Sequence, residues 1–383
     1  MSQLPLYQNS QPDFSPHLNK GLKFERFFNQ FDRTWQVKDD AKTVFLNTFV
    51  GCCGDRQALE NFTSQQFSLA HSLNGDGKVY ELDWHMVTGM GNSHPVENGF
   101  SWHHTLGVPY IPGSQVKGII RSLIEQYFDD EANTENGINK KNLLHEWFGS
   151  DDKKSENQNK DSQVGRFIFF DAIPVEKPML VIDIMTPHMG KWYAEGDKIK
   201  NIDDTMRIPA DWHDPVPIPF LVVKSAKFLF TIADRKGGEE SQSSIDDVFE
   251  MLNYALELLG AGAKTQTGYG YMSLNLMLTS SYEEIYADKK AKKRKQEELE
   301  RDEKDNEGKP DYYIKIKKLN NILNQKNLDF TKEYEDIEVL INIALSSEII
   351  WKVDDVIKLL DLIENKKTTG FLKAKRPKNK FVT

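Results

Sequence analysis

Cysteine is nearly absent from this sequence, which has two in 383 residues, Cys52 and Cys53. Adjacent cysteines are poorly placed for an ordinary disulfide, and there is no second thiol cluster to complete a zinc site. So little cysteine is typical of proteins from a reducing compartment. We therefore expect a cytoplasmic protein.

Long apolar runs are also missing. The opening stretch MSQLPLYQNSQPDF has neither the basic start nor the apolar run of a signal peptide. No later segment approaches the roughly 20 apolar residues that are needed to cross a bilayer. The sequence thus predicts a soluble intracellular protein with no membrane partner.

Positive charge is not in excess. The chain has 49 Lys and Arg against 58 Asp and Glu, which gives a formal net charge of −9. No global positive field draws in nucleic acid, so any nucleic-acid site must be a local basic surface. The length allows two or three domains, or one elaborated domain with an appendage.

Apolar patterning gives the fold class. VYELDWHMVTGMG and FSWHHTLGVPYIP are predicted to be extended, VGRFIFFDAIP and PMLVIDIMTPH to be buried strands, and SSIDDVFEMLNYALELLG to be a capped amphipathic helix. Across roughly Val79 to Leu276 the order is strand, helix, strand, strand, helix, strand. This is the split βαβ pattern of a ferredoxin-like fold. We predict an α+β protein: a ferredoxin-like (RRM-like) domain with insertions, plus a helical C-terminal extension.

Composition divides the chain into four expected regions. Residues 1–78 are predicted to form an N-terminal arm and a helical segment, and residues 79–280 the ferredoxin-like domain. Residues 281–310 change from basic to acidic, as in a charged helical linker. Residues 311–383 have helical apolar spacing and are expected to form a small helical extension.

The stretch GVPYIPGSQVKGIIRSLIE has strand-like residues, then Pro-Gly-Ser, then a helix. A helix start binds phosphate well through its unpaired amides and positive dipole end. Gly113 lets a backbone come close, and Ser114 is a good N-cap candidate. Lys117 and Arg121, one turn apart, can reach the same polyanion. The alternative is an ordinary strand-turn-helix with solvated cations on its edge.

The stretch GAGAKTQTGYG lies between a predicted helix and a predicted strand. Its four glycines, at 260, 262, 268 and 270, enclose Lys264, Thr265, Gln266 and Thr267. Such a loop exposes amides and hydroxyls around a cation, which suits a nucleic-acid backbone. It is not a P-loop, because the order strand-GxxxxGK[ST]-helix is absent. A plain helix-to-strand connection is the alternative.

These two stretches, PYIPGSQVKGIIR and GAGAKTQTGYG, resemble the hallmark segments of the repeat-associated (RAMP) proteins of CRISPR effector complexes, the second being their glycine-rich loop. HHTLGVPYIPGS, FFDAIP, IDIMTPH and DPVPIPFLVV together resemble the sixth-subunit family of the type III-B (Cmr) complex. The likeness covers roughly residues 80–276. The residues before it and the tail from 281 onward lie outside it.

The resemblance implies a RAMP domain in residues 79–280 that holds the 3′ portion of the guide RNA at the end of a backbone filament, without a cofactor. The expected partners are the guide RNA and its target duplex, a repeating backbone RAMP subunit, a small helical subunit and a tandem-RAMP subunit. Base pairing would read the sequence. The guide-backbone contacts carried over are Gly113, Ser114, Lys117, Arg121, Gly262, Lys264, Thr265, Gly268 and Gly270.

An alternative function is an endoribonuclease that processes precursor or target RNA. His103 or His104 would supply an acid or base, with Asp83, Asp183 and His188 as further candidates. Neighbours on a strand face opposite sides, so at most one of the paired histidines can point to a given site.

A non-catalytic subunit is the prediction that we favour. In the RAMP subunits that cleave target RNA, the resemblance places the catalytic aspartate between the first strand and the first helix. The comparable loop here, TGMGNSHPVENGF, has His94 and Glu97 but no aspartate. Asp171 and Asp183 lie within apolar strands, and we interpret them as hydrogen-bonded structural carboxylates and not as metal ligands.

An aromatic insertion lies at roughly residues 185–220, with Trp192 and Trp212. It is either a thumb-like element against the RNA duplex or a packing surface for a neighbouring subunit. The sequence leaves both possibilities open.

Overall fold

The computed structural model describes residues 19–128, 140–150, 163–235 and 243–309, and also Tyr313, Ile314 and Lys317, except positions 30, 33, 35, 38, 39, 202, 206 and 211. The chain divides into two compact units, Met1–Asp288 and Lys289–Thr383. The predicted arm before residue 19 and almost all of the predicted extension at 311–383 lie outside the described residues.

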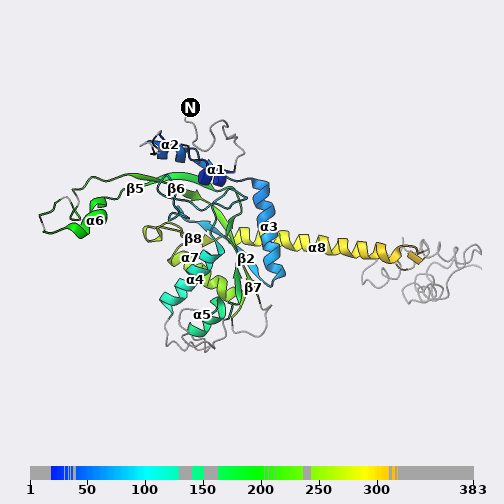
Figure 1. Cartoon of the computed structure of the whole chain (residues 1–383). Coiled ribbons are helices and arrows are strands. Elements are labelled where there is room, and N and C mark those ends of the chain that lie inside the picture. Colours follow the sequence, from blue (N-terminus) through cyan, green and yellow to red (C-terminus); the bar gives the residue numbers. More distant parts are fainter. Residues whose placement is uncertain are drawn as a thin grey trace, which may run out of the picture. The chain divides into compact units, whose positions relative to one another are not determined.

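An antiparallel sheet forms the centre of the first unit (Figure 1). Its strand order is β3-β7-β2-β8, and β4 also pairs with β7. The bounds are β2 Asp76–Leu82, β3 Phe167–Phe169, β4 Ile173–Pro174, β7 Lys227–Asp234 and β8 Met272–Leu274. Helices together with an antiparallel sheet confirm the predicted α+β class.

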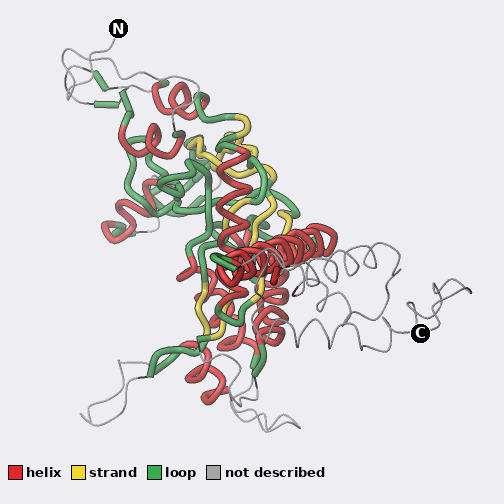
Figure 2. Tube along the Cα trace, turned by 90° about the vertical axis from the view of Figure 1, so that its right-hand side faces the viewer, coloured by secondary structure: helices red, strands yellow, loops and turns green. Residues whose placement is uncertain are grey.

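Helices pack against both faces of this sheet. Figure 2 shows the chain turned by 90°, with helices in red and strands in yellow. Helix α3 (Arg56–Ser72) packs against one face, and α4 (Gly113–Tyr127) and α7 (Ile245–Leu258) against the other. Successive residues of β7 face opposite sides: Phe228 and Phe230 join the core with α4 and α7, whereas Leu229 packs against Phe67 of α3. All three β7 residues are fully buried, which explains why consecutive positions on both faces of the strand are apolar.

Helix α7 has the predicted caps. The amide of Asp247 donates to Ser244 Oγ at 3.2 Å, and the amide of Ser244 donates to Asp247 Oδ2 at 2.6 Å. This reciprocal pair is a capping box. After Leu259, Gly260 takes a φ of +71°, so the chain leaves the helix where the sequence predicted.

A second sheet has the order β1-β5-β6, with β1 Gly51–Cys52, β5 Met179–Met185 and β6 Ile218–Ser225. PFLVVKSAKFLFTI, one apolar segment in the sequence, is divided at Ala226, so β6 and β7 belong to different sheets. PMLVIDIMTPH was correctly predicted as a strand, but within β5 only Leu180 is buried. Between β5 and β6 lies helix α6 (Gly190–Glu195), at the far end of the pair from α1 and α2 (Figure 1).

Two extended predictions were too long. VYELDWHMVTGMG begins as β2, but the strand ends at Leu82. FSWHHTLGVPYIP forms only single bridges, Trp102 with Pro109 and Ile111 with Ala172. After β2, both segments are joined to the rest of the fold by isolated backbone hydrogen-bonded bridges and not by continuous strand pairing.

The other helices are α1 Lys20–Arg26, α2 Ala41–Asn47, α5 Lys140–Phe148 and α8 Leu276–Asn306. The first turns of α8 pack beside α3, where Tyr282 Oη lies 2.9 Å from Thr63 Oγ1 and the Tyr286 ring stacks on His71. None of the helices described here combines the length and the apolar character of a membrane span.

Candidate nucleic-acid interface

The start of α4 is capped from within the chain. The helix begins at Gly113, and the amide of Gly113 donates to Asp171 Oδ1 at 2.7 Å. The predicted N-cap, Ser114, is therefore wrong: the cap position is Pro112, because a carboxylate from a distant segment takes the first amide. Asp171 is thus a hydrogen-bonded carboxylate, as predicted. A Cβ on Gly113 would lie 2.2 Å from the carbonyl oxygen of Phe169, so its close approach is to the chain itself.

The two cations of α4 also have partners within the chain. Lys117 Nζ donates to the carbonyl of Phe148 at 3.0 Å, at the last residue of α5. A cation at the end of a helix binds orphan carbonyls and the negative dipole end. Arg121 Nε lies 2.7 Å from Glu125 Oε1, an i,i+4 pair on the same helix. Lys117 thus links α4 to the end of α5, whereas Arg121 is paired within α4.

The glycine-rich loop takes the left-handed backbone region five times. Gly260, Gly262, Gly268 and Gly270 have φ values of +71°, +102°, +95° and +79°, and Lys264 has +60°. Residues other than glycine adopt this region at a cost, so the glycines are needed for the path of the loop.

Two of these glycines also allow close backbone contacts. A Cβ on Gly262 would lie 2.2 Å from the carbonyl oxygen of Val87, and one on Gly270 would lie 1.9 Å from that of Ala261. Gly268 is different, because the nearest atoms to its Cβ position belong to the Trp84 ring, at 3.8 Å. The loop is thus fastened at its ends and open at Gly268.

The tip of the loop is a short 3₁₀ turn, Thr265–Thr267. Thr267 donates its amide and its hydroxyl to the carbonyl of Lys264, at 3.0 and 2.8 Å. Gln266 and Thr267 are exposed. The Lys264 ammonium lies 5.5 Å from the centre of the Phe220 ring and has no carboxylate partner among the described residues. The tip therefore offers a cation and polar groups to a ligand.

A polar network fixes the loop to β5. Tyr269 Oη donates to Asp183 Oδ2 at 2.6 Å, and His85 Nδ1 lies 3.4 Å from the same oxygen. Burial raises the pKa of Asp183, but the bonds from Tyr269, the Ile184 amide and His85 outweigh it, so the pKa is lowered overall. Burial, with the Asp183 charge, raises the pKa of Tyr269. Asp183 is hydrogen-bonded, as predicted.

The candidate acid–base histidines have other contacts. His103 Nδ1 accepts from the amide of Leu106 at 3.3 Å, and burial lowers the His103 pKa, although the Asp171 charge opposes this. His104, its neighbour, is exposed, so the two face different surroundings. His103 therefore has the environment of a neutral turn residue.

His94, in the segment TGMGNSHPVENGF between β2 and α4, is fixed within an aromatic cluster. Its Nδ1 accepts from the Val96 amide at 3.2 Å, its Nε2 lies 2.8 Å from the carbonyl oxygen of Phe24, and its ring stacks on the Phe24 ring. Burial lowers its pKa. Glu97 pairs with Lys42. These two side chains of the loop have structural partners.

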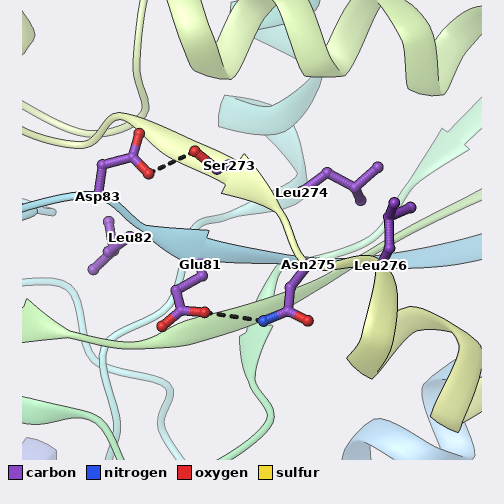
Figure 3. A pocket seen from close by; sticks show the side chains of 7 residues that line it. All are labelled: Glu81, Leu82, Asp83, Ser273, Leu274, Asn275 and Leu276. Carbon is purple, nitrogen blue, oxygen red and sulfur yellow. Dashed lines mark hydrogen bonds between the residues drawn. The ribbon is translucent and has the colours of Figure 1, made fainter.

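A shallow hollow of about 380 Å³ lies along β2 and β8 (Figure 3). Ser273 Oγ donates to Asp83 Oδ1 at 2.6 Å, and Asn275 Nδ2 donates to Glu81 Oε2 at 2.9 Å. Two carboxylates disfavour a phosphate here, so the hollow is not a candidate RNA site. Over the described ranges, no group of three or more His, Cys, Asp or Glu is arranged to hold a metal.

The sequence analysis missed Trp84 and His85. Their rings stack with centroids 4.6 Å apart and an interplanar angle of 11°, and Trp84 borders the glycine-rich loop at Gly268. The signal in the sequence was an aromatic pair inside VYELDWHMVTGMG. Because this segment was predicted to be a strand, nothing in the sequence indicated that the aromatic pair would lie beside the glycine-rich loop.

Known proteins identify the class. A family model of the RAMP superfamily matches residues 80–273, more than half of the chain and including both predicted segments. The chain therefore belongs to the RAMP superfamily.

Curated relatives are more specific. The chain is 30% identical over 253 residues to the CRISPR system Cmr subunit Cmr6 of Pyrococcus furiosus, covering 55% of this chain and 70% of that protein. It is 25% identical over 185 residues to the CRISPR system CMR subunit Cmr6 of Saccharolobus solfataricus, covering 47% of this chain and 49% of that protein. Within the superfamily, this chain is thus similar to Cmr6 subunits.

Two solved structures are also similar. One, a type III-B Cmr-beta complex bound to cognate target RNA, gives a TM-score of 0.40 at 20% identity and covers 58% of this chain and 66% of that chain. The other, Cmr6 from Pyrococcus furiosus, gives 0.30 at 26% identity and covers 52% and 98%. Both scores are below 0.5, so the family assignment rests on the sequence matches.

Proposed function

We propose that this chain is a non-catalytic, RNA-binding subunit of a type III-B (Cmr) RNA-guided CRISPR complex, and that it holds the 3′ portion of the guide RNA in antiviral defence. The observation that carries the proposal is the glycine-rich loop: it is fastened to the second sheet, and it presents Lys264 without a carboxylate partner in the described chain. The similarity to Cmr6 subunits supports the type of complex.

The sheet supports a ferredoxin-like interpretation of the RAMP domain. The strands β2, β3, β7 and β8, with α4 between the first two and α7 between the last two, give the order strand, helix, strand, strand, helix, strand. Their arrangement β3-β7-β2-β8 is fully antiparallel. In this interpretation β1, β5, β6 and the aromatic insertion are additions to the domain.

The chemistry of the loop suits a backbone and not a base sequence. A cation and exposed polar side chains, here Lys264, Gln266 and Thr267, can contact phosphate and ribose, which are the same in every guide. Base pairing between guide and target then supplies the specificity. The partners that follow are the guide RNA, its target duplex and the other Cmr subunits at that end of the complex.

The histidine contacts support a non-catalytic role. A general base must be able to reach a substrate proton in its basic form. The Nδ1 atoms of His94 and His103 each accept a hydrogen bond from a backbone amide. This occupies one of the two ring nitrogens in each residue. The second candidate function, an endoribonuclease, would need His103 Nε2 or the exposed His104 to act alone.

The test is guide-RNA binding by the complex assembled with wild-type chain or with Lys264→Ala. Arg56→Ala is the matched control, because Arg56 is an exposed cation on α3 that is paired with Glu60. We expect Lys264→Ala to weaken binding similarly for unrelated guides and to reduce the salt slope by about 0.7. Unchanged binding, or a loss confined to one guide, would contradict the proposal.

A further inference from the structure

Trp84 lies where the chain passes from the central sheet to the second sheet. The amide of Asp83 donates to the carbonyl of Tyr271 at 3.0 Å, next to β8. Two residues after Trp84, Met86 exchanges two hydrogen bonds of 2.9 Å with β6. The backbone that carries Trp84 is therefore held on both sides, by a different sheet on each.

The Trp84 ring is held in place and yet remains exposed. It stacks on the His85 ring, and the Tyr269 ring lies tilted against it with centroids 4.9 Å apart. Trp84 is nevertheless 48% exposed, whereas Tyr269 is buried. A single exposed apolar side chain is common on protein surfaces, so the exposure of Trp84 matters because the ring is ordered and lies beside the cation of the glycine-rich loop.

The support beneath the ring is itself fixed. Gly270 donates its amide to the carbonyl of His85 at 2.7 Å, and His85 Nδ1 lies 3.4 Å from Asp183 Oδ2. Tyr269 donates to that same carboxylate oxygen. The stacked pair is thus preorganised, which reduces the entropy that a ligand must lose on binding.

The ring adjoins the open part of the glycine-rich loop. The Cβ position of Gly268 is 3.8 Å from the Trp84 ring, and Lys264 lies across the loop over Phe220. One ribose joins the phosphate and the base of a nucleotide, so an RNA strand whose backbone contacts this loop brings its bases close to the indole. A protein partner would need no such neighbouring cation.

We propose that Trp84, supported by His85, is a stacking platform for one unpaired nucleobase of single-stranded RNA that lies along the glycine-rich loop. This rests on the proposed RNA-binding function and adds a contact with the face of a base. Every base has a π-face, so stacking on an aromatic ring tolerates any sequence. The platform therefore suits a subunit that must accept many guides.

The first test measures the affinity of the full chain for a labelled single-stranded RNA of mixed sequence, at several salt concentrations. Trp84→Ala is expected to weaken binding between about fivefold and a hundredfold, and Trp84→Phe much less. The salt slope should stay unchanged in both variants, because stacking releases no counterions. Tyr127→Ala is the control, since Tyr127 is 59% exposed on α4 and should not affect the affinity.

The second test locates the base. RNAs that each lack a single base are titrated against wild type and Trp84→Ala. Wild type should lose affinity at one abasic position, and Trp84→Ala should have lost the same amount already and be insensitive to it. A change in folding alone would lower the affinity for every RNA equally and would also appear in the thermal melting curve. Abasic sensitivity at the same position in Trp84→Ala would overturn the proposal.

The outcomes separate the platform from the proposed function. If wild type binds RNA with a salt slope that depends on Lys264, and Trp84→Ala binds equally well, the platform is wrong and the proposed function stands. If neither the chain nor the assembled complex binds RNA, both are wrong. If Trp84→Ala impairs only assembly with another subunit, the ring is a protein contact and the platform is wrong.

Discussion

The start of α4 and the glycine-rich loop both place glycine, a hydroxyl side chain and a cation at a helix end, yet their polar groups have different partners. At α4, Asp171 takes the first amide and Phe148 and Glu125 take the cations. In the loop, backbone contacts fix the ends and Thr267 donates to the Lys264 carbonyl within the tip, but the Lys264 ammonium has no carboxylate partner among the described residues. A phosphate at α4 would have to displace a carboxylate, whereas one at the loop would not.

The largest expected effect comes from the fastened end of the loop. Gly270→Val should unfold the loop and destabilise the chain by more than about 3 kcal/mol. The backbone there has a positive φ, and the new Cβ would lie 1.9 Å from the carbonyl oxygen of Ala261. Chemical denaturation measures this. Gly268→Val is the matched variant, since it shares the positive φ but has open space, and it should cost clearly less. Equal losses would remove the distinction between a fastened end and an open tip.

The cap of α4 should give the next largest effect. Asp171→Ala removes the acceptor for the Gly113 amide, and we expect a loss of about 1 kcal/mol, the usual cost of losing a helix cap. Thermal denaturation checks this. Asp183→Ala is a useful comparison, because it should affect the loop and its RNA binding more than α4. If Asp171→Ala instead left stability unchanged and strengthened RNA binding, the helix start would be a phosphate site that Asp171 screens.

The cations provide a direct comparison of the two regions. Lys117→Ala combined with Arg121→Ala should weaken guide-RNA retention similarly for unrelated guides if these residues contact the RNA backbone. Because both have partners within the chain, we expect Lys264→Ala alone to lower RNA affinity more than the double variant does. Filter binding with two unrelated guides measures this. The reverse ranking would transfer the main backbone contact to α4.

A smaller effect concerns pH. Burial lowers the pKa of His94 in the folded chain, so the unfolded chain binds the proton first as pH falls. The stability associated with His94 is therefore complete above the unfolded pKa of about 6.5 and decreases as pH falls through and below that value. The melting temperature should fall less between pH 7.5 and 5.5 in His94→Asn than in wild type. Burial also lowers the pKa of His103, so part of the dependence of melting temperature on pH should remain in His94→Asn.

For RNA cleavage we expect no effect at all. The purified chain should not cleave labelled precursor or target RNA, with or without divalent metal, and His103→Ala or His104→Ala should leave cutting by the whole complex unchanged. A catalytic acid or base would be worth roughly 100-fold or more in rate. Cleavage by the isolated chain that disappears in either variant would establish a ribonuclease instead.

Local signals determined a large part of this protein. The capping box at Ser244 and the exit at Gly260 lie within a few residues of the helix that they bound, so α7 was predicted correctly. The helical spacing of the apolar residues after Pro112 predicted α4 in the same way. The glycine spacing indicated a loop of special conformation, and the two motifs indicated the RAMP superfamily.

Only the tertiary structure decided which groups remain available. Asp171 is 58 residues from the amide that it caps, and Trp84 and Gly268 meet only because two sheets are joined between β2 and β6. Lys224, Ser225 and Lys227 interrupt the apolar run around Ala226, but nothing in these residues indicates that β6 and β7 belong to different sheets. A residue's own neighbours in sequence fix its backbone preference, but its partners come from distant segments. The sequence therefore determined where cations and glycines stand, and the fold decided which of them face a ligand.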